Sequence, residues 1–181
     1  MRIGILCFFI LGMVGCRDCC SYKADLYGEA NAKVYTTEAR GRGKNIGEVR
    51  FRDVEGGMMV DVELTNLMEG EHGFHIHEFG DCRATFHRNG KIMMAGKAGG
   101  HFDIYKTMKH KGPNGGGHIG DLPRLNVDKN GEVIDRFFVE NVNVNMIRGR
   151  TVVVHDGGDN YSDEPVVLGG GGDRVACGII E

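Results

Sequence analysis

The stretch from Ile46 to Leu64 reads IGEVRFRDVEGGMMVDVEL, and it decides the fold class. Apolar and charged residues largely alternate on both sides of the central Glu55-Gly56-Gly57. A period of two is typical of a β-strand with one buried face. The adjacent glycines between the two runs supply the chemistry of a turn. The stretch therefore predicts a β-hairpin.

Other short apolar runs, separated by turn residues, extend this signal along the chain. Leu125–Val127 and Val133–Val139 predict a second hairpin, with Asp128–Gly131 as its turn. Thr151–His155 and Arg174–Ile180 are further predicted strands. No run keeps the apolar spacing of a helix for three turns, so we expect little helix. Together these elements predict an all-β protein, an antiparallel sandwich or barrel.

Two glycine-rich segments, Phe79–Gly117 and Asp156–Asp173, do not fit as strands and are too long to be simple turns. A compact domain keeps loops of this length for function. The histidines border or occupy them. We therefore expect these two long loops to be functional.

The overall composition fits a single domain and excludes some function classes. With 181 residues and 41% hydrophobic content, the chain can bury a sizeable core. Its formal net charge is -3 with both signs interspersed, so it lacks the basic surface of a nucleic-acid binder. Its 30 glycines follow no G-X-Y period, which excludes a collagen.

The amino-terminal segment is apolar from Ile3 to Val14, which is shorter than the roughly 20 residues needed to span a bilayer. Such a short apolar run is typical of a signal-peptide core. We therefore expect residues 1–15 to be a signal peptide.

Met13-Val14-Gly15-Cys16 resembles the cleavage box of bacterial lipoproteins, in which the cysteine becomes the lipidated first residue. We expect lipidation of Cys16, followed by a flexible tether over residues 16–30 that contains Cys19 and Cys20. A plain cleaved secretory signal and an uncleaved anchor are the alternatives. All three export the domain, to the periplasm or the cell envelope.

Histidines carry the strongest functional signal. His75-Ile76-His77 lies in a short strand-like run, so both imidazoles point to one face, with Cα atoms roughly 7 Å apart, and can converge on one metal. Three imidazoles with a carboxylate suit zinc, whereas a purely imidazole site also suits a redox-active copper. Further ligand-type residues follow, most of them close to glycine: His101, His110, His118, Asp121 and His155. These seven residues are about enough for two ions that share one ligand.

Two other histidines have simpler interpretations. His72 precedes Gly73 and is expected to be a structural, hydrogen-bonded residue. His87 is expected to be a solvated loop residue.

Six motifs follow one another in order along the chain. They are GFHIHEFGDC (73–82), GGHFD (99–103), KHKGP (109–113), GHIGDLP (117–123), VVHDGGDN (153–160) and GGDRVACG (171–178). In order and spacing these motifs resemble the copper/zinc superoxide dismutase family in its bacterial exported form. The resemblance covers roughly residues 31–181, the expected folded domain, and it implies a Greek-key β-sandwich or barrel.

The resemblance implies one copper and one zinc ion per subunit. It makes His75, His77, His101 and His155 the copper ligands. It makes His101, His110, His118 and Asp121 the zinc ligands, with His101 bridging the two metals.

The resemblance also implies roles for residues around the metals. Cys82 and Cys177 match the intrasubunit disulfide of the family. Asp159 matches the carboxylate that links His75 to His110, and Arg174 matches the arginine that receives the anionic substrate. His101 and Arg174 are therefore the expected catalytic residues.

The implied activity is dismutation of superoxide to dioxygen and hydrogen peroxide by alternating reduction and oxidation of copper, with zinc in a structural role. A non-enzymatic copper- and zinc-binding lipoprotein is the alternative, but its signature would be a missing copper ligand or arginine, and neither is missing. The expected partners are superoxide, a membrane through the Cys16 lipid only, and a second copy in a possible homodimer.

The sequence departs from the family pattern in two places. Ile104 replaces the proline common after the His101 motif, but it removes no ligand. The loop Asp156–Asp173 contains no lysine or arginine, so steering of the anion is expected from the other long loop. The candidate cations there are Arg83, Arg88, Lys91 and Lys97.

Overall fold

The computed structural model describes residues 27–181. The expected signal peptide, the lipidation site Cys16, and Cys19 and Cys20 lie outside the described residues. From residue 27 onward, no helix has the length and apolar character needed to cross a membrane.

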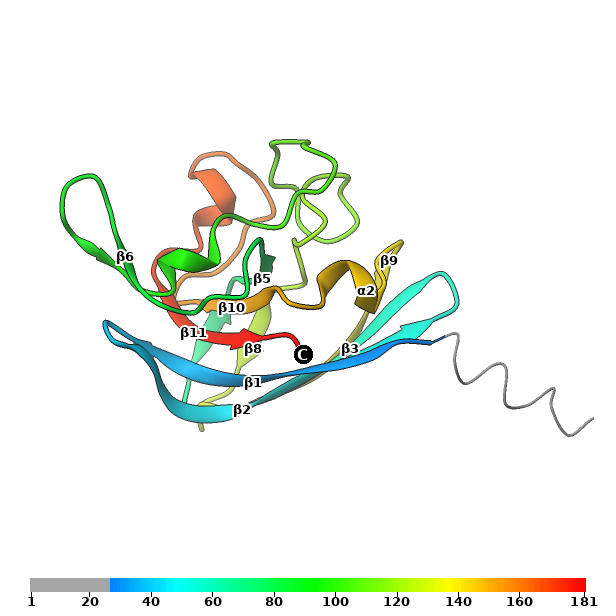
Figure 1. Ribbon diagram of the computed structural model, residues 1–181, viewed down its shortest axis with the longest axis horizontal. Helices are drawn as coiled ribbons and strands as arrows, with labels where there is room; N and C mark the ends of the chain where they lie inside the picture. The colour runs from blue at the N-terminus through cyan, green and yellow to red at the C-terminus, as the bar shows by residue number, and fades with distance from the viewer. Residues whose placement is uncertain (1–26) are drawn as a thin grey trace, which may run out of the picture.

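Strands account for nearly all of the regular structure (Figure 1), as the sequence predicts. The main sheet has seven antiparallel strands in the order β5-β10-β11-β1-β2-β3-β9. These strands are β1 (Glu29–Glu38), β2 (Gly41–Val54), β3 (Gly57–Leu64), β5 (Phe74–His77), β9 (Val133–Glu140), β10 (Thr151–His155) and β11 (Arg174–Ile179).

Smaller elements connect the strands of this sheet. Two short antiparallel pairs form separate sheets, β4 (Gly70–His72) with β8 (Leu125–Val127) and β6 (Thr85–Phe86) with β7 (Ile92–Met93). The helical turns are η1 (Gly96–Ala98), α2 (Val144–Ile147) and η2 (Val167–Gly170).

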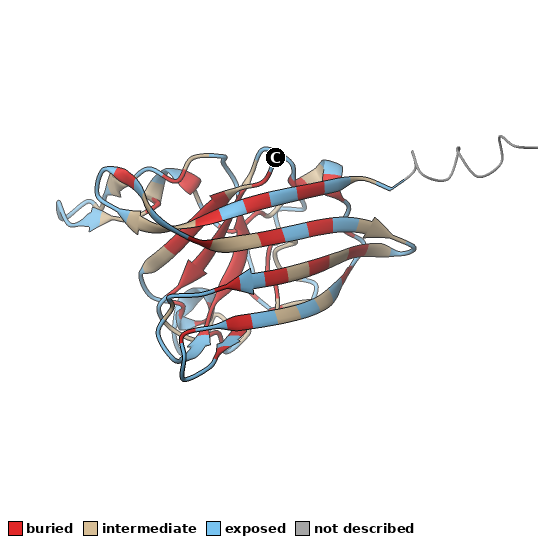
Figure 2. Cartoon of the chain, turned by 90° about the horizontal axis from the view of Figure 1, so that it is seen from below, coloured by how far each residue is buried: buried red, intermediate tan, exposed pale blue. Residues whose placement is uncertain are grey.

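The predicted hairpin over residues 46–64 is confirmed as β2 and β3. Phe51 lies opposite Val60 in this pair, and the alternate residues Val60 and Val62 are fully buried. Figure 2 shows the same alternation of buried and exposed residues along neighbouring strands. One face of each strand therefore packs against the hydrophobic core, as the period of two predicts.

The predicted second hairpin is wrong, although its strands exist. β8 pairs with β4, and β9 pairs with β3 over eight consecutive residue pairs from Gly57–Glu140 to Leu64–Val133. The long register with β3 gives β9 more hydrogen bonds than the short β8 could offer. Local turn chemistry at Asp128–Gly131 reverses the chain but does not choose the strand partner.

The first strand begins at Glu29, two residues before the expected start of the domain at residue 31. Ala30 is already buried, and Glu29 lies opposite Arg52 in the β1–β2 pair.

Two long connections place β5 and β10, the strands that carry histidines, side by side. β3 is next to last in the sheet order, and after it the chain crosses to form β5 at the opposite end. After β9, the last strand in the order, the chain crosses again to form β10 beside β5. These long crossings between antiparallel strands are Greek-key connections. All residues of β5 and β10 are buried, so both faces of these strands are covered. The core covers one face, and the two long loops lie over the other (Figure 1).

A disulfide between Cys82 and Cys177 ties the first long loop to β11. Both cysteines are buried, their Cα atoms are 5.8 Å apart, and they are 95 residues apart in sequence. A covalent link across so long a chain segment removes much conformational entropy from the unfolded state.

Replacing both cysteines with serine is expected to lower the free energy of unfolding by about 2–5 kcal/mol, because the unfolded chain regains that entropy. Urea denaturation followed by circular dichroism measures the change. Reductant should destabilise the unaltered protein similarly and leave the double variant unaffected. Equal stability of the oxidised protein and the double variant would contradict the prediction.

Candidate metal centre

Strand β5 places two imidazoles on the side of the sheet that faces the long loops. His75 and His77 alternate with Phe74 and Ile76, which belong to the hydrophobic core. Both histidines are 0% exposed. The alternation of strand side chains therefore separates core residues from imidazoles within four positions, as the His-x-His pattern predicts.

Strand β10 adds a third imidazole beside these two. It pairs with β5 so that Val153 lies opposite His75, and it ends at His155. The backbone N–H of His155 donates to the carbonyl of Gly73 at 2.8 Å, which fixes the strand end next to the start of β5.

The first long loop folds back along the free edge of β5. The N–H of Ile76 donates to the carbonyl of Gly120 at 2.9 Å, and the N–H of Phe102 donates to the carbonyl of Ile76 at 2.8 Å. Isolated β-bridges also join His77 to His101 and His75 to Asp121. These backbone contacts bring His101 and Asp121 to the imidazoles of β5.

The first donor group consists of four buried imidazoles, His75, His77, His101 and His155, whose ligand atoms lie within 4.8 Å of one another. His77 Nδ1 and His155 Nδ1 face the carbonyls of Gly99 and Gly172 at 3.1 and 3.4 Å. Their Nε2 atoms are 3.3 Å apart and carry the lone pairs. A purely imidazole group of this kind suits copper.

The second donor group consists of His101, His110, His118 and Asp121. Asp121 Oδ1 lies 2.9, 3.0 and 3.2 Å from the Nδ1 atoms of His101, His110 and His118. In a tetrahedral zinc site the donor atoms are separated by about 3.3 Å, given ligand bonds of about 2.0–2.1 Å. The spacing and the donor set both fit zinc. His101 belongs to both groups, and its Nδ1 lies in the second.

Asp159 links the two donor groups by hydrogen bonds to one histidine of each. Its carboxylate accepts hydrogen bonds from His75 Nε2 and His110 Nε2, both at 2.8 Å. The N–H of Tyr161 also donates to it, at 2.7 Å. Gly169 leaves room for this contact, because an added Cβ would come within 2.0 Å of the Asp159 carboxylate.

Two buried nitrogens show that the site fits cations. Since His75 and His110 donate from Nε2 to Asp159, their neutral rings carry a lone pair at Nδ1. Both Nδ1 atoms are buried without a hydrogen-bond partner. At His110 this lone pair faces the acceptor oxygen of Asp121 at 3.0 Å. A metal ion satisfies such facing acceptors, and buried unsatisfied atoms are otherwise costly.

Burial keeps the imidazoles of the first group neutral. It lowers the pKa of His75, although the hydrogen bond to Asp159 opposes it, and it lowers the pKa of His101 to about 4. It also lowers the pKa values of His77 and His155 well below the ordinary value of 6.5. Neutral imidazole is the form that binds metals.

His110 responds differently because two carboxylates face it. Burial opposes its protonation, but the protonated ring would donate from Nδ1 to Asp121 as well as from Nε2 to Asp159, which outweighs burial and raises the pKa of His110 to about 9. The pKa values of both carboxyl groups are lowered despite burial, because they accept hydrogen bonds from histidines. A cation or proton is thus strongly favoured between these groups.

Arg174 is the first residue of β11. It lines a cavity of about 260 Å³ that is also lined by His101 and His155. Its guanidinium donates to the carbonyls of Ala95 and Gly99 at 2.8 and 2.7 Å. Burial lowers the pKa of Arg174 from its ordinary value of 12.5, but a guanidinium stays charged in proteins. The side chain therefore gives the cavity a fixed positive charge.

The two remaining histidines lie outside the donor groups. His72 is buried, and its two ring nitrogens face the carbonyls of His155 and Met68 at 2.6 and 2.8 Å, which confirms its structural role. His87 lies in the loop after β6, is half-buried and lines the cavity, so it stays accessible to solvent as predicted, but it also belongs to the cavity wall. Pairing of β6 with β7 draws it into the cavity wall.

The four candidate steering cations differ in their surroundings. Arg83 pairs with Asp81, with Nε 2.8 Å from Oδ1. Lys91 Nζ lies 3.4 Å from Asp173 beside Arg174. Arg88 and Lys97 are exposed, and neither forms an ion pair with a residue of the described part. Steering by these cations stays a prediction.

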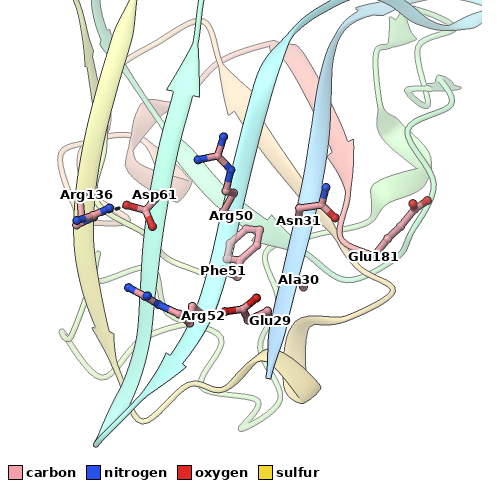
Figure 3. A pocket seen from close by; sticks show the side chains of 9 residues that line it. All are labelled: Glu29, Ala30, Asn31, Arg50, Phe51, Arg52, Asp61, Arg136 and Glu181. Atoms are coloured by element: carbon pink, nitrogen blue, oxygen red, sulfur yellow. Dashed lines mark hydrogen bonds and ion pairs between the residues drawn. The ribbon is translucent and has the colours of Figure 1, made fainter. Parts of the chain in front are cut away.

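A second hollow, of about 370 Å³, lies along strands of the main sheet (Figure 3), and no histidine lines it. Basic residues alternate there with acidic ones across neighbouring strands, and Arg136 forms an ion pair with Asp61. The charges largely offset one another, and no ligand-type cluster lines the hollow.

Some supporting residues carried no signal in the sequence. Asp163 accepts a hydrogen bond from the N–H of His110 at 2.9 Å, and Arg124 donates to the carbonyl of Asp159 at 2.9 Å. Both contacts join segments far apart in the chain, so spacing alone could not reveal them.

Comparisons with known proteins agree with this geometry. Residues 45–180 match the family model described as copper/zinc superoxide dismutase (SODC). "Superoxide dismutase [Cu-Zn]" of Brucella abortus is 45% identical over 150 residues, which cover 82% of this chain and 86% of the relative. The protein of the same name from Escherichia coli K12 is 43% identical over 144 residues, covering 79% and 83%.

Solved structures support the same fold. The copper/zinc superoxide dismutase from Brucella abortus matches with a TM-score of 0.80 and 43% identity, covering 85% of this chain and 100% of that chain. The solution structure of the monomeric copper, zinc superoxide dismutase from Salmonella enterica matches with a TM-score of 0.74 and 39% identity, with the same coverage. The predicted all-β Greek-key fold is thereby confirmed.

The relatives are bacterial and are named as enzymes, so a metal-binding lipoprotein without activity is not favoured. The disulfide and the two donor groups described above are those that the resemblance implies. The chain belongs to the copper/zinc superoxide dismutase family, oxidoreductases that convert superoxide to dioxygen and hydrogen peroxide with one copper and one zinc ion.

Proposed function

We propose that the two donor groups divide the metals between them. His75, His77, His101 and His155 hold copper, and His101, His110, His118 and Asp121 hold zinc. The observation that carries this assignment is the sharing of His101, whose Nδ1 faces Asp121 and leaves Nε2 for the all-imidazole group.

When bound, copper would supply the one-electron oxidation and reduction of superoxide, whereas zinc has no redox chemistry and would have a structural role, held by His101 and the other residues of the second donor group. Two superoxide anions and two protons give one dioxygen and one hydrogen peroxide. His101 is the imidazole that lies between the two groups and also lines the cavity. We assign it the delivery of one of these protons from Nε2, which would carry the proton only when it is not bound to copper.

Arg174 is the proposed docking group for superoxide. It lies in the wall of the same cavity as His101 and His155, and its guanidinium is held by two carbonyls without a carboxylate partner in the described part of the chain. A fixed cation inside a narrow cavity attracts and orients a small anion.

Export and anchoring are also proposals. We propose that residues 1–15 are removed as a signal peptide and that Cys16 carries a lipid, followed by the tether of residues 16–30 before the folded domain. The Cys82–Cys177 disulfide supports an oxidising, extracytoplasmic compartment such as the periplasm. A homodimer stays a prediction, since the Salmonella enterica relative is named monomeric.

Arg174→Ala is expected to slow superoxide consumption at least about tenfold while both metals stay bound, because the cavity loses its charge. Pulse radiolysis with metal content quantified in the same samples measures the rate. The unaltered protein should approach about 10⁸–10⁹ M⁻¹s⁻¹. Arg174→Lys keeps the charge and should recover part of the rate. A fully active alanine variant would overturn the assignment.

Asp159→Asn is expected to weaken metal binding by about 10- to 100-fold. His75 and His110 donate to different oxygens of Asp159, and in asparagine one of these becomes an NH₂ group that cannot accept, so the ring that faces it would shift its proton to the proposed ligand atom Nδ1. Competition with a chelator, followed by mass spectrometry of bound copper and zinc, measures the affinities. Asp173→Asn, an exposed acid of the same loop, is the matched control. Equal losses in both variants would refute a specific role for Asp159.

Lipidation at Cys16 predicts a mature chain that begins at this residue with added acyl mass, and Cys16→Ala should abolish that mass. Intact-mass spectrometry of protein from membranes measures both. Cleavage without acyl mass would instead identify a plain secretory signal, and an uncleaved chain would identify an anchor.

A further inference from the structure

The cavity that leads to the proposed copper ligands has three wall residues with no role in the functions assigned above. His87, Met93 and Met94 line it together with His101 and His155. All three are half-buried, whereas His101 and His155 are buried. The three side chains therefore lie nearer to solvent than the proposed copper ligands do.

The β6–β7 hairpin arranges two of these side chains on one face. Thr85 lies opposite Met93, and His87 follows Thr85 by two residues, so His87 and Met93 point to the same side. The N–H of His87 donates to the carbonyl of Lys91 at 2.8 Å, which extends the hairpin to His87. The intervening Phe86 is 71% exposed, as expected for a residue on the opposite face.

The sulfur of Met93 lies against Gly96. An added Cβ at Gly96 would lie 3.1 Å from Met93 Sδ and 2.2 Å from Thr85 Cγ2. A side chain at this position would therefore displace Met93 and the hairpin. Met94 follows Met93 on the way to η1 and lines the same cavity.

Two thioethers and one imidazole form a soft donor set, which favours Cu(I). Zinc takes thiolate, imidazole and carboxylate ligands, so thioethers discriminate against it. We propose that His87, Met93 and Met94 form a Cu(I) uptake site at the mouth of the cavity, from which copper passes inward to His101 and His155. The proposal rests on the assignment of those imidazoles to copper.

The transfer involves no change in the oxidation state of copper, so it needs no oxidant or reductant. Solvent can reach the half-buried donors, so a chelated ion can be captured and released there. Asp173 also lines the cavity, with its carboxylate 3.4 Å from Lys91 Nζ.

An equilibrium titration tests the site directly. The full-length holoenzyme, with its thiols blocked by N-ethylmaleimide, is titrated without oxygen with Cu(I) supplied as its bathocuproine disulfonate chelate. We expect it to take up one more Cu(I) than the Met93→Leu/Met94→Leu variant. Methionine to leucine changes volume little, so the variant should fold. X-ray absorption should detect sulfur ligands on the additional Cu(I).

The matched control is Met68→Leu/Met108→Leu, which removes methionines that are 79% and 82% exposed and lie outside this cavity. It should take up as much Cu(I) as the unaltered protein. His87→Gln should retain less Cu(I) at equal chelator concentration. No additional Cu(I) in the unaltered protein, or equal uptake by the Met93→Leu/Met94→Leu variant, would overturn the proposal.

Loading kinetics separate an uptake site from a mere surface site. Zinc-loaded, copper-free Met93→Leu/Met94→Leu protein should fill its copper site more slowly from the same chelate, but to the same final copper content. An unchanged rate would overturn the uptake role. The rate of superoxide consumption per bound copper should stay unchanged, so failure here is distinguishable from failure of the copper assignment itself.

Discussion

Contacts between imidazoles and two buried carboxylates determine the chemistry of this site. Asp159 accepts hydrogen bonds from the Nε2 atoms of His75 and His110, which leaves lone pairs on the Nδ1 atoms of the neutral rings. Asp121 then faces three Nδ1 atoms at once. In a dry interior this crowding of acceptors is unfavourable unless a cation lies among them. The metal ions are therefore part of the stability of the site as well as of its reactivity.

The scaffold keeps this costly arrangement in place. β5 and β10 are anchored in the core on one face, and the loops that supply His101, His110 and Asp159 are fixed to them by backbone hydrogen bonds, by the disulfide and by close packing around Gly169. Loops alone would be too mobile for donor atoms that must converge within a few ångström. The long crossings between strands provide chain length for function while the sheet provides rigidity.

Local patterns in the sequence predicted what local physics determines. Alternation over residues 46–64 identified the β2–β3 hairpin, and His-x-His identified the pair of imidazoles on β5.

Pairing between strands far apart in the chain was harder to predict from the sequence. β8 and β9 look like a hairpin because of the turn between them, yet each pairs with a strand formed far earlier in the chain. β6 and β7 have two residues each, too few to show a period, so the sequence could not show that the loop of His87 lines the cavity. Ordered motifs made the ligand residues recognisable, but supporting contacts such as Asp163 with His110 depend on the folded loops.

The second long loop is negatively charged, which opposes the attraction of Arg174 for an anion. This loop has five acidic residues and no basic ones: Asp156, Asp159, Asp163, Glu164 and Asp173. Asp159 is occupied by histidines and Asp163 by two backbone N–H groups, so their charges are partly compensated. Asp173 is adjacent to Arg174 and would weaken its attraction for an anion. Lys91 lies 3.4 Å from Asp173 and offsets this charge. Lys91 therefore favours the approach of an anion mainly by neutralising the charge of Asp173. Arg174 is then the positive charge that attracts superoxide inside the cavity.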